Sequence, residues 1–191
     1  AYVAFLLTSM LMLIAYQQLY STLSVYLRDV HGIPAQGYGF LMSMNAGTVV
    51  LSQFWVTRKA KLYPPMLMMS LGAAFYMFGF TMHGFVSAYT LFVVAVLLIT
   101  IGEMIVTPLG QALAANFAPE DMRGRYMACF GLSWAIPSTF APWAAGLVID
   151  NYNPNLVWYA SGIVSAVAVV GFCILHFKAR TAPATSRIPL I

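Results

Sequence analysis

The residue best suited to chemistry in this chain is Glu103, a carboxyl in the middle of a long apolar segment. An ionised side chain at the centre of a bilayer costs about 2.5–3.5 kcal/mol to insert, so an intramembrane acid usually has a function. Desolvation favours the neutral form, and a group that changes charge with its surroundings suits a proton or cation site. The alternative is a permanently protonated structural carboxyl that bonds to a neighbouring helix.

Polar side chains recur at helical spacing in the apolar segments around this carboxyl, at intervals of three, four and seven residues. Such side chains in a membrane turn toward protein or toward a water-filled cavity. We therefore expect a substrate cavity lined by Gln17, Tyr20, Ser21, Asn45, Thr107, Gln111, Trp134 and Ser138. For the amides an equal alternative is hydrogen bonding between helices, and for Trp134 it is core packing.

Glycine and proline interrupt the same segments. Gly102 and Pro108 flank Glu103, and Pro137 and Pro142 lie in the following apolar segment. Proline removes one backbone hydrogen bond and kinks a helix, which exposes a carbonyl. These four positions are predicted to serve as kinks or gates, although both residue types are also common in membrane helices.

Neither a metal site nor a cofactor is expected. His31, His83 and His176 lie in separate segments without ligand spacing. An intramembrane serine protease would need Ser133 and His176 at one depth, whereas one lies inside its segment and the other ends its own. The chain is therefore not expected to be an enzyme, and nucleic acid is not an expected partner.

Composition predicts an all-α membrane protein. Hydrophobic residues make up 61% of the 191 residues and charged residues only 7%, where a soluble domain carries about 25%. At about 20 residues per span, this length holds six helices and little else. The predicted bundle occupies residues 1–178, a cytoplasmic tail follows at 179–191, and the spans lie at about 2–27, 38–56, 65–82, 87–117, 126–149 and 156–177.

The cations fix an orientation. Lys and Arg gather at every second junction between apolar segments, and Arg28 is the exception. Cationic short loops remain in the cytoplasm. We therefore predict a multi-pass protein of the cell (inner) membrane with both ends of this segment cytoplasmic. Trp55 and Trp158, near segment ends, are predicted to anchor at the membrane surface.

Polarity also repeats along the chain. The third and sixth apolar segments have no Asn, Gln, Asp or Glu in their cores. The first, second and fourth contain Gln17, Asn45 and Glu103, and the fifth contains Ser133, Trp134, Ser138 and Thr139 around its two prolines. This pattern is expected of two three-helix repeats, with the third helix of each facing lipid. The chain begins within an apolar stretch and has no basic leader, so we interpret it as a piece of something longer.

The basic connection after the second span resembles a loop motif of the major facilitator superfamily (MFS), Gly-x-x-x-Asp-Arg-x-Gly-Arg-Arg. Arg58 and Lys61 keep its cations, whereas Gln53, Thr57 and Ala60 stand at the positions of its Gly, Asp and second Gly. Such loss is typical of the second half of these proteins. The resemblance covers essentially the whole chain.

Two later stretches strengthen the resemblance. Residues 102–108 and the loop 119–124, which contains Arg123 and Gly124, are similar to the tenth helix and following loop of drug–proton antiporter-like members. The segment from Gly131 to Gly146 resembles an eroded antiporter motif. The chain is thus identified as the C-terminal six-helix half of an MFS transporter.

This resemblance implies a secondary transporter, and with Glu103 it predicts proton-coupled export of small amphipathic compounds. The expected partners are the lipid bilayer, the N-terminal six-helix half, protons and a small-molecule substrate. An alternative is an uptake carrier for a sugar, peptide or metabolite. An alternative of another class is a non-transporting membrane scaffold or an intramembrane enzyme.

Overall fold

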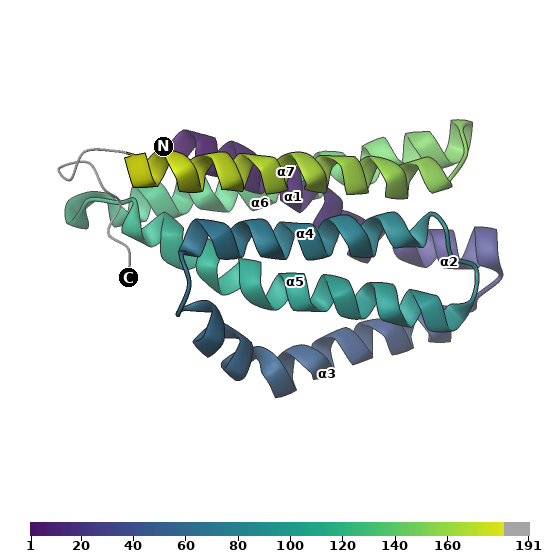
Figure 1. Cartoon of the computed structure of the whole chain (residues 1–191). Coiled ribbons are helices and arrows are strands. Elements are labelled where there is room, and N and C mark those ends of the chain that lie inside the picture. Colours follow the sequence, from purple (N-terminus) through teal and green to yellow (C-terminus); the bar gives the residue numbers. More distant parts are fainter. Residues whose placement is uncertain (182–191) are drawn as a thin grey trace.

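The structure is a computed structural model that describes residues 1–181, which form seven α-helices and one short 3-10 helix without any β-strand. The helices follow one another with short connections (Figure 1). Their bounds are α1 Tyr2–Ser21, α2 Leu23–His31, α3 Ala35–Ala60, α4 Pro65–His83, α5 Tyr89–Asn116, α6 Arg123–Asn151 and α7 Asn155–Thr181, with the 3-10 helix at Glu120–Met122.

The first predicted span is interrupted at Thr22, which separates α1 from α2. The hydroxyl of Ser21 donates a hydrogen bond to the Gln17 carbonyl 2.8 Å away, and the Thr22 hydroxyl donates to the Gln18 side chain. Serine and threonine that bond back within a helix bend it. The helical path then continues to His31, beyond the predicted end of the span.

Five helices, α1, α4, α5, α6 and α7, are long and apolar enough to cross a membrane. The exception among the longer helices is α3, which has 26 residues but a polar composition that includes Asn45, Thr48, Ser52 and Gln53. An all-helical membrane architecture is thus confirmed. The arrangement as six spans in two repeats stays a prediction.

The helix that carries Glu103, α5, packs against helices from both parts of the chain. This helix packs against α4 and α3 and touches α6, while α7 packs against α4 and α1, and α1 also packs against α6. In Figure 1, α3 lies at the border of the bundle, beside α5. The carboxyl on α5 therefore faces helices from early in the chain.

Small residues bring α4 and α5 together. A Cβ added at Gly102 would lie 2.8 Å from the Gly72 carbonyl oxygen and 2.8 Å from a ring carbon of Tyr76. A Cβ at Gly79 would lie 2.9 Å from the Ala95 carbonyl oxygen. Close backbone approach at small residues is how membrane helices gain packing contacts. Gly102 thus lies where α5 meets α4, within an unbroken helix.

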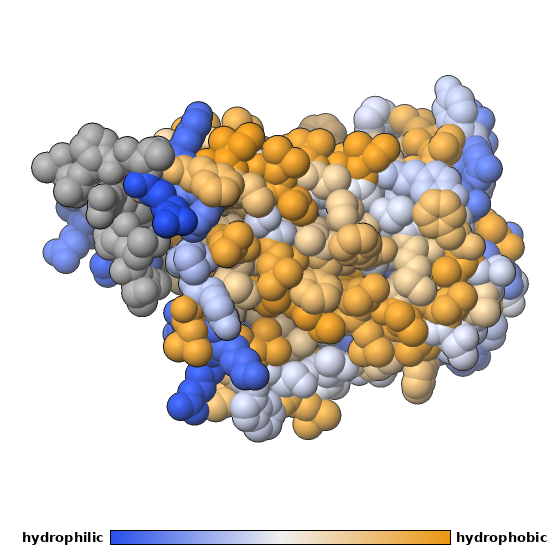
Figure 2. Space-filling model, viewed as in Figure 1, coloured by the Kyte–Doolittle hydropathy of each residue, from blue (hydrophilic) through white to orange (hydrophobic). Residues whose placement is uncertain are grey.

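The two ends of the bundle differ in charge. The N-terminus, the α3–α4 and α5–α6 connections and the end of α7 lie at one end in Figure 1, and the other connections lie opposite. The hydrophilic side chains at the left of Figure 2 belong to the first end. Its described cations are Arg58, Lys59, Lys61, Arg123, Arg125, Lys178 and Arg180. The predicted tail falls mostly on residues 182–191, outside the described residues, and α7 continues to Thr181.

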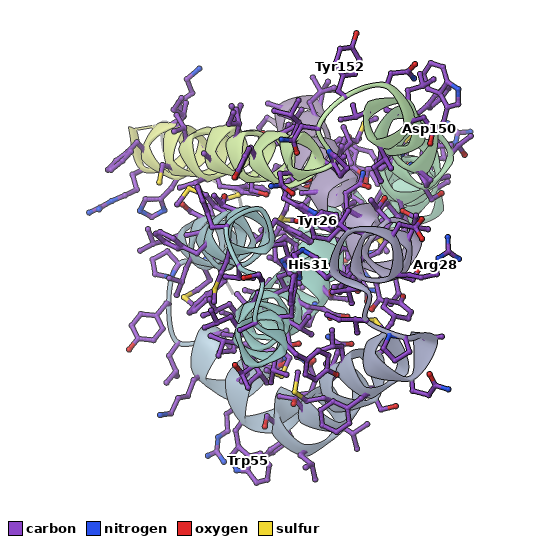
Figure 3. All side chains as sticks on the ribbon, turned by 90° about the vertical axis from the view of Figure 1, so that its right-hand side faces the viewer. Tyr26, Arg28, His31, Trp55, Asp150 and Tyr152 are labelled. Carbon is purple, nitrogen blue, oxygen red and sulfur yellow. The ribbon has the colours of Figure 1, made fainter. Side chains whose placement is uncertain are left out.

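At the opposite end, aromatic and histidine rings close the bundle between α2, α4, α5 and α7. Figure 3 shows Tyr26 and His31 pointing inward. Trp158 is fully buried and stacks on His83 with ring centroids 4.8 Å apart. The prediction that Trp158 anchors at the membrane surface is therefore wrong, because it belongs to this cluster. Trp55 is 65% exposed and points away from the bundle.

Candidate functional site

Glu103 is held between three helices by two hydrogen-bond donors. The Tyr16 hydroxyl on α1 donates to its Oε1 at 2.7 Å, and the Asn45 amide on α3 donates to its Oε2 at 3.0 Å. The carboxyl itself is half-buried on α5. Each oxygen thus accepts one bond from a different helix, an arrangement that suits a carboxylate.

The donors are themselves fixed in place. The Asn45 amide also donates to the Thr100 hydroxyl at 2.8 Å, and that hydroxyl donates to the Val96 carbonyl one turn earlier. Both Asn45 and Thr100 are buried. Thr100 and Glu103 are three residues apart, so they share a face of α5 and meet one side chain of α3 together.

A second hydroxyl extends the network toward the surface. The hydroxyls of Tyr16 and Tyr20, one helical turn apart on α1, lie 3.0 Å from each other. Tyr16 is buried, whereas Tyr20 is 46% exposed. Hydrogen bonds thus connect the carboxyl with an accessible phenol.

Aromatic rings enclose the carboxyl's donor. Tyr16 stacks on the buried Tyr76 of α4 with centroids 5.6 Å apart, and the edge of Trp134 on α6 meets it at 5.9 Å. Trp134 is half-buried. The site therefore combines one titratable group with aromatic surface contributed by three helices, α1, α4 and α6.

Of the predicted cavity residues, the structure joins Tyr20, Asn45 and Trp134 to Glu103 through these contacts. Gln17 and Thr107 are half-buried, and Gln111 is exposed on the same helix as Glu103. Ser21 and the exposed Ser138 donate their hydroxyls to carbonyls of their own helices. Their part in a cavity stays a prediction.

The predicted kink and loop residues lie in or beside helices. Pro108 is inside α5, and Pro137 and Pro142 are inside α6. Arg58 lies in the last turn of α3 and Lys61 directly follows that helix, while Arg123 and Gly124 begin α6. The four loop residues are exposed at the basic end.

Sequence reasoning left two residues out of the candidate site, Tyr16 and Thr100. Tyr16 is four residues before Tyr20, and this spacing places both on one face of α1. Thr100 lies one turn before Glu103 on the same face. Helical spacing from Glu103 is the signal that could have identified Thr100, whereas for Tyr16 the sequence offers only its spacing from Tyr20.

Comparisons with known proteins agree on one family. Residues 3–190 match the Major Facilitator Superfamily. MFS-type transporter YqjV of Bacillus subtilis (strain 168) is 24% identical over 167 residues, which is 86% of this chain and 40% of that protein. YttB of the same organism is 23% identical over 91% of this chain and 44% of its own length. The chain thus spans about two fifths of these relatives.

A third relative has a described activity. A Na(+), Li(+), K(+)/H(+) antiporter of Planococcus maritimus is 29% identical over 105 residues, 55% of this chain and 25% of that protein.

Solved structures share the fold. A POT peptide transporter in complex with alafosfalin superposes with a TM-score of 0.82 at 17% identity, over 93% of this chain and 38% of that one. A POT family transporter in complex with 5-aminolevulinic acid gives a TM-score of 0.79 at 16% identity, over 93% and 40%.

The family match, the apolar helices and the shared fold lead to the same conclusion. The protein is a multi-pass membrane protein, and its relatives are transporters rather than enzymes. The chain belongs to the major facilitator superfamily of membrane transporters.

Proposed function

We propose that this chain is the C-terminal half of a secondary active transporter that exports small amphipathic compounds in exchange for protons. The observation that carries the proposal is the half-buried Glu103 carboxyl, bonded to donors from two other helices and linked through Tyr16 to the exposed Tyr20. A carboxyl in such a place exchanges a proton without leaving the bundle.

The proposed half consists of two three-helix units. The first contains α1 with α2, then α3 and α4, and the second contains α5, α6 and α7. In transporters built from repeats, the binding site lies where the repeats meet near the middle of the membrane. The N-terminal six-helix half is the proposed partner and supplies the other wall of the cavity. The charged end supports a cytoplasmic location for both ends of this segment in the inner membrane.

The hydroxyl network lets the site hold both protonation states. With the carboxyl ionised, the single proton of Tyr16 goes to Oε1, so Tyr20 supplies the proton between the two phenols. When a proton reaches the Tyr20 hydroxyl, Tyr20 passes one proton on to Tyr16, and Tyr16 passes its own proton to Oε1. Glu103 then donates to Tyr16 and Tyr16 donates to Tyr20, while the bond from Asn45 to Oε2 remains but is weaker, because its acceptor is now neutral. The proton thus enters or leaves through the two tyrosines.

Aromatic surface beside the carboxyl supports an amphipathic substrate. Trp134 is half-buried and Tyr20 is exposed. Both lie near the carboxyl of Glu103, which is negatively charged when deprotonated. Rings bind apolar groups and attract cations through their faces. Thr107 and Gln111 follow Glu103 by one and two turns of α5 and extend the proposed cavity, together with Gln17, Ser21 and Ser138.

Export by exchange has support from one relative. The protein from Planococcus maritimus is named as an antiporter of cations against protons. Its cargo is not carried over to this chain, but proton-linked exchange agrees with a titratable group at this position. A substrate and a proton shift a conformational balance only through different affinities for its two states.

The test is Glu103→Gln in the full-length transporter, reconstituted in liposomes and assayed for substrate flux with and without a pH gradient. Glutamine keeps the shape, and its amide can donate to Tyr16 while its oxygen accepts from Asn45, so it imitates the protonated site. We expect normal insertion and a flux that no longer responds to the gradient.

Glu120→Gln is the matched control, because it makes the same change at an exposed carboxyl outside the long helices. It should leave the response to the gradient intact. If Glu103→Gln retains the pH dependence of the unaltered protein, the carboxyl is structural and the proposal fails.

A further inference from the structure

The proline in α5 leaves one backbone acceptor without its usual partner. Pro108 has no N–H, so it cannot donate the usual helical hydrogen bond to the carbonyl of Met104, four residues earlier. A buried carbonyl that lacks a donor is costly. Some other group must therefore satisfy it.

That group comes from α3. The side-chain amide of Gln53 donates to the Met104 carbonyl at 2.9 Å, and it also donates to the Thr57 hydroxyl at 2.7 Å one turn along its own helix. Gln53 and Thr57 are both half-buried. They stand where the family loop motif has Gly and Asp. A glycine at position 53 would have no amide to offer.

Two amides thus join α3 to α5. Asn45 and Gln53 are eight residues apart, which is about 12 Å along the helix and about 80° around it, and both bond to α5. Asn45 bonds to the carboxyl of Glu103, whereas Gln53 bonds to the peptide carbonyl of the next residue, Met104. The first bond would be stronger to an ionised carboxyl than to a neutral one, whereas the second goes to a peptide carbonyl that does not change.

We propose that Gln53 is a positioning residue for the proton site: its amide replaces the hydrogen bond that Pro108 removes and fastens α3 to α5 beside Glu103. The bond from Gln53 to Met104 holds this part of α3 against α5, while the bond from Asn45 changes in strength with the protonation of the carboxyl. Movement of α3 thereby follows protonation. This inference rests on the proposed proton role of Glu103.

Two substitutions separate this role from general packing. Gln53→Met keeps the length of the side chain and removes the donor. Pro108→Ala restores an N–H at position 108, which can bond to the Met104 carbonyl and make the Gln53 amide redundant. The four proteins of this cycle are made in the full-length transporter, and Ser52→Ala, at the half-buried neighbouring position, is the control.

The first measurement is thermal unfolding in detergent. Gln53→Met should lower the midpoint temperature in the unaltered background. In the Pro108→Ala background the same substitution should lower it by about half as much or by less than half. Ser52→Ala should not show this dependence on position 108. Equal losses in both backgrounds would overturn the assignment of Gln53 to the proline break.

The second measurement is the pH profile of transport in liposomes. Gln53→Met should flatten the profile, and adding Pro108→Ala should leave it flat even where the unfolding effect is repaired, because the double variant still has no amide that joins position 53 of α3 to α5. A coupled unfolding effect with an unchanged profile would overturn the positioning role while leaving Glu103 in place. Unchanged profiles in both Gln53→Met and Glu103→Gln would instead overturn the proposed function itself.

Discussion

A single phenol, that of Tyr16, connects the half-buried carboxyl of Glu103 with the surrounding helices. Tyr16 donates to Glu103, touches the Tyr20 hydroxyl, and packs against aromatic rings of α4 and α6. Its ring is buried in the core while its hydroxyl serves the polar network. A conservative change at this residue therefore alters the chemistry while leaving the packing intact.

Tyr16→Phe should slow proton-driven transport and flatten its pH profile. The variant keeps the ring that packs against α4 and α6 but removes the hydroxyl that bonds to Oε1 of Glu103 and to Tyr20. The measurement is proton-driven flux in liposomes across a series of internal and external pH values.

Tyr20→Phe provides the comparison for that experiment. It leaves the bond between Tyr16 and Glu103 in place and interrupts only the path to the exposed phenol. We expect a slower flux with the midpoint of the profile unchanged. Identical profiles for Tyr16→Phe and the unaltered protein would show that the network does not control the proton.

Sequence patterns identified the acid but only part of its surroundings. Glu103 was visible because a carboxyl in an apolar segment has no other explanation of equal strength, and helical spacing brought in Asn45. Tyr16 could not be ranked above other aromatic residues, because its role depends on contact with a helix far along the chain. Trp158 was misplaced for the same reason: proximity to a helix end does not reveal a neighbour such as His83.

At the scale of helices, α4 and α5 form the tightest crossing near the site. Gly102 directly precedes the titratable residue and faces the backbone of α4 at Gly72. Any side chain there must push the two helices apart. The position of Glu103 relative to α1 and α3 thus depends on a residue that makes no polar contact of its own.

Gly102→Ala should lower the free energy of unfolding by about 1–3 kcal/mol, the usual cost of forcing an extra group into a packed interior. The measurement is chemical unfolding of the full-length protein in detergent. Gly47→Ala is the matched control, because a Cβ at Gly47 on α3 would meet nothing within 4 Å. In that control the better helix propensity of alanine should leave stability equal or higher.

A stability of Gly102→Ala equal to that of Gly47→Ala would contradict the close crossing of α4 and α5.

Hydropathy predicts long apolar helices, because apolar length is a local property of the chain, while the number and bounds of the spans stay a prediction. The break between α1 and α2 at Thr22 could not be predicted, because hydropathy carries no information on a local change in backbone conformation. Nor did hydropathy explain why α3 is polar: two of its amides serve α5.

Across the whole molecule, charge is separated along the bundle axis. Seven described cations lie at one end, and at the other Arg28 pairs with the neighbouring Asp29 at 2.6 Å. The guanidinium of Arg28 holds the pKa of the Asp29 carboxyl below its usual range. The pair presents little net charge, so the asymmetry that orients the protein comes from the basic end.

Labelling with a membrane-impermeant maleimide tests that orientation in intact cells. Single cysteines at Gln36, Phe85 and Asn153, all exposed at the less basic end, should react from outside. Cysteines at Lys59 and Arg123 should react only after the membrane is permeabilised. The background needs replacement of Cys129 and Cys173, which are free thiols. Outside labelling at Lys59 would overturn the proposed orientation.

The packing of α7 has a consequence for how the protein is made. Ser70 on α4 donates to the carbonyl of Val169 on α7 at 3.2 Å, and Gly162 lies against Thr81. At the ribosome, α4 emerges long before α7, so its polar and small residues first face lipid or the insertion machinery. The contacts of α4 with α7 can therefore form only after α7 has entered the membrane, so the packing of α4 is completed late in synthesis.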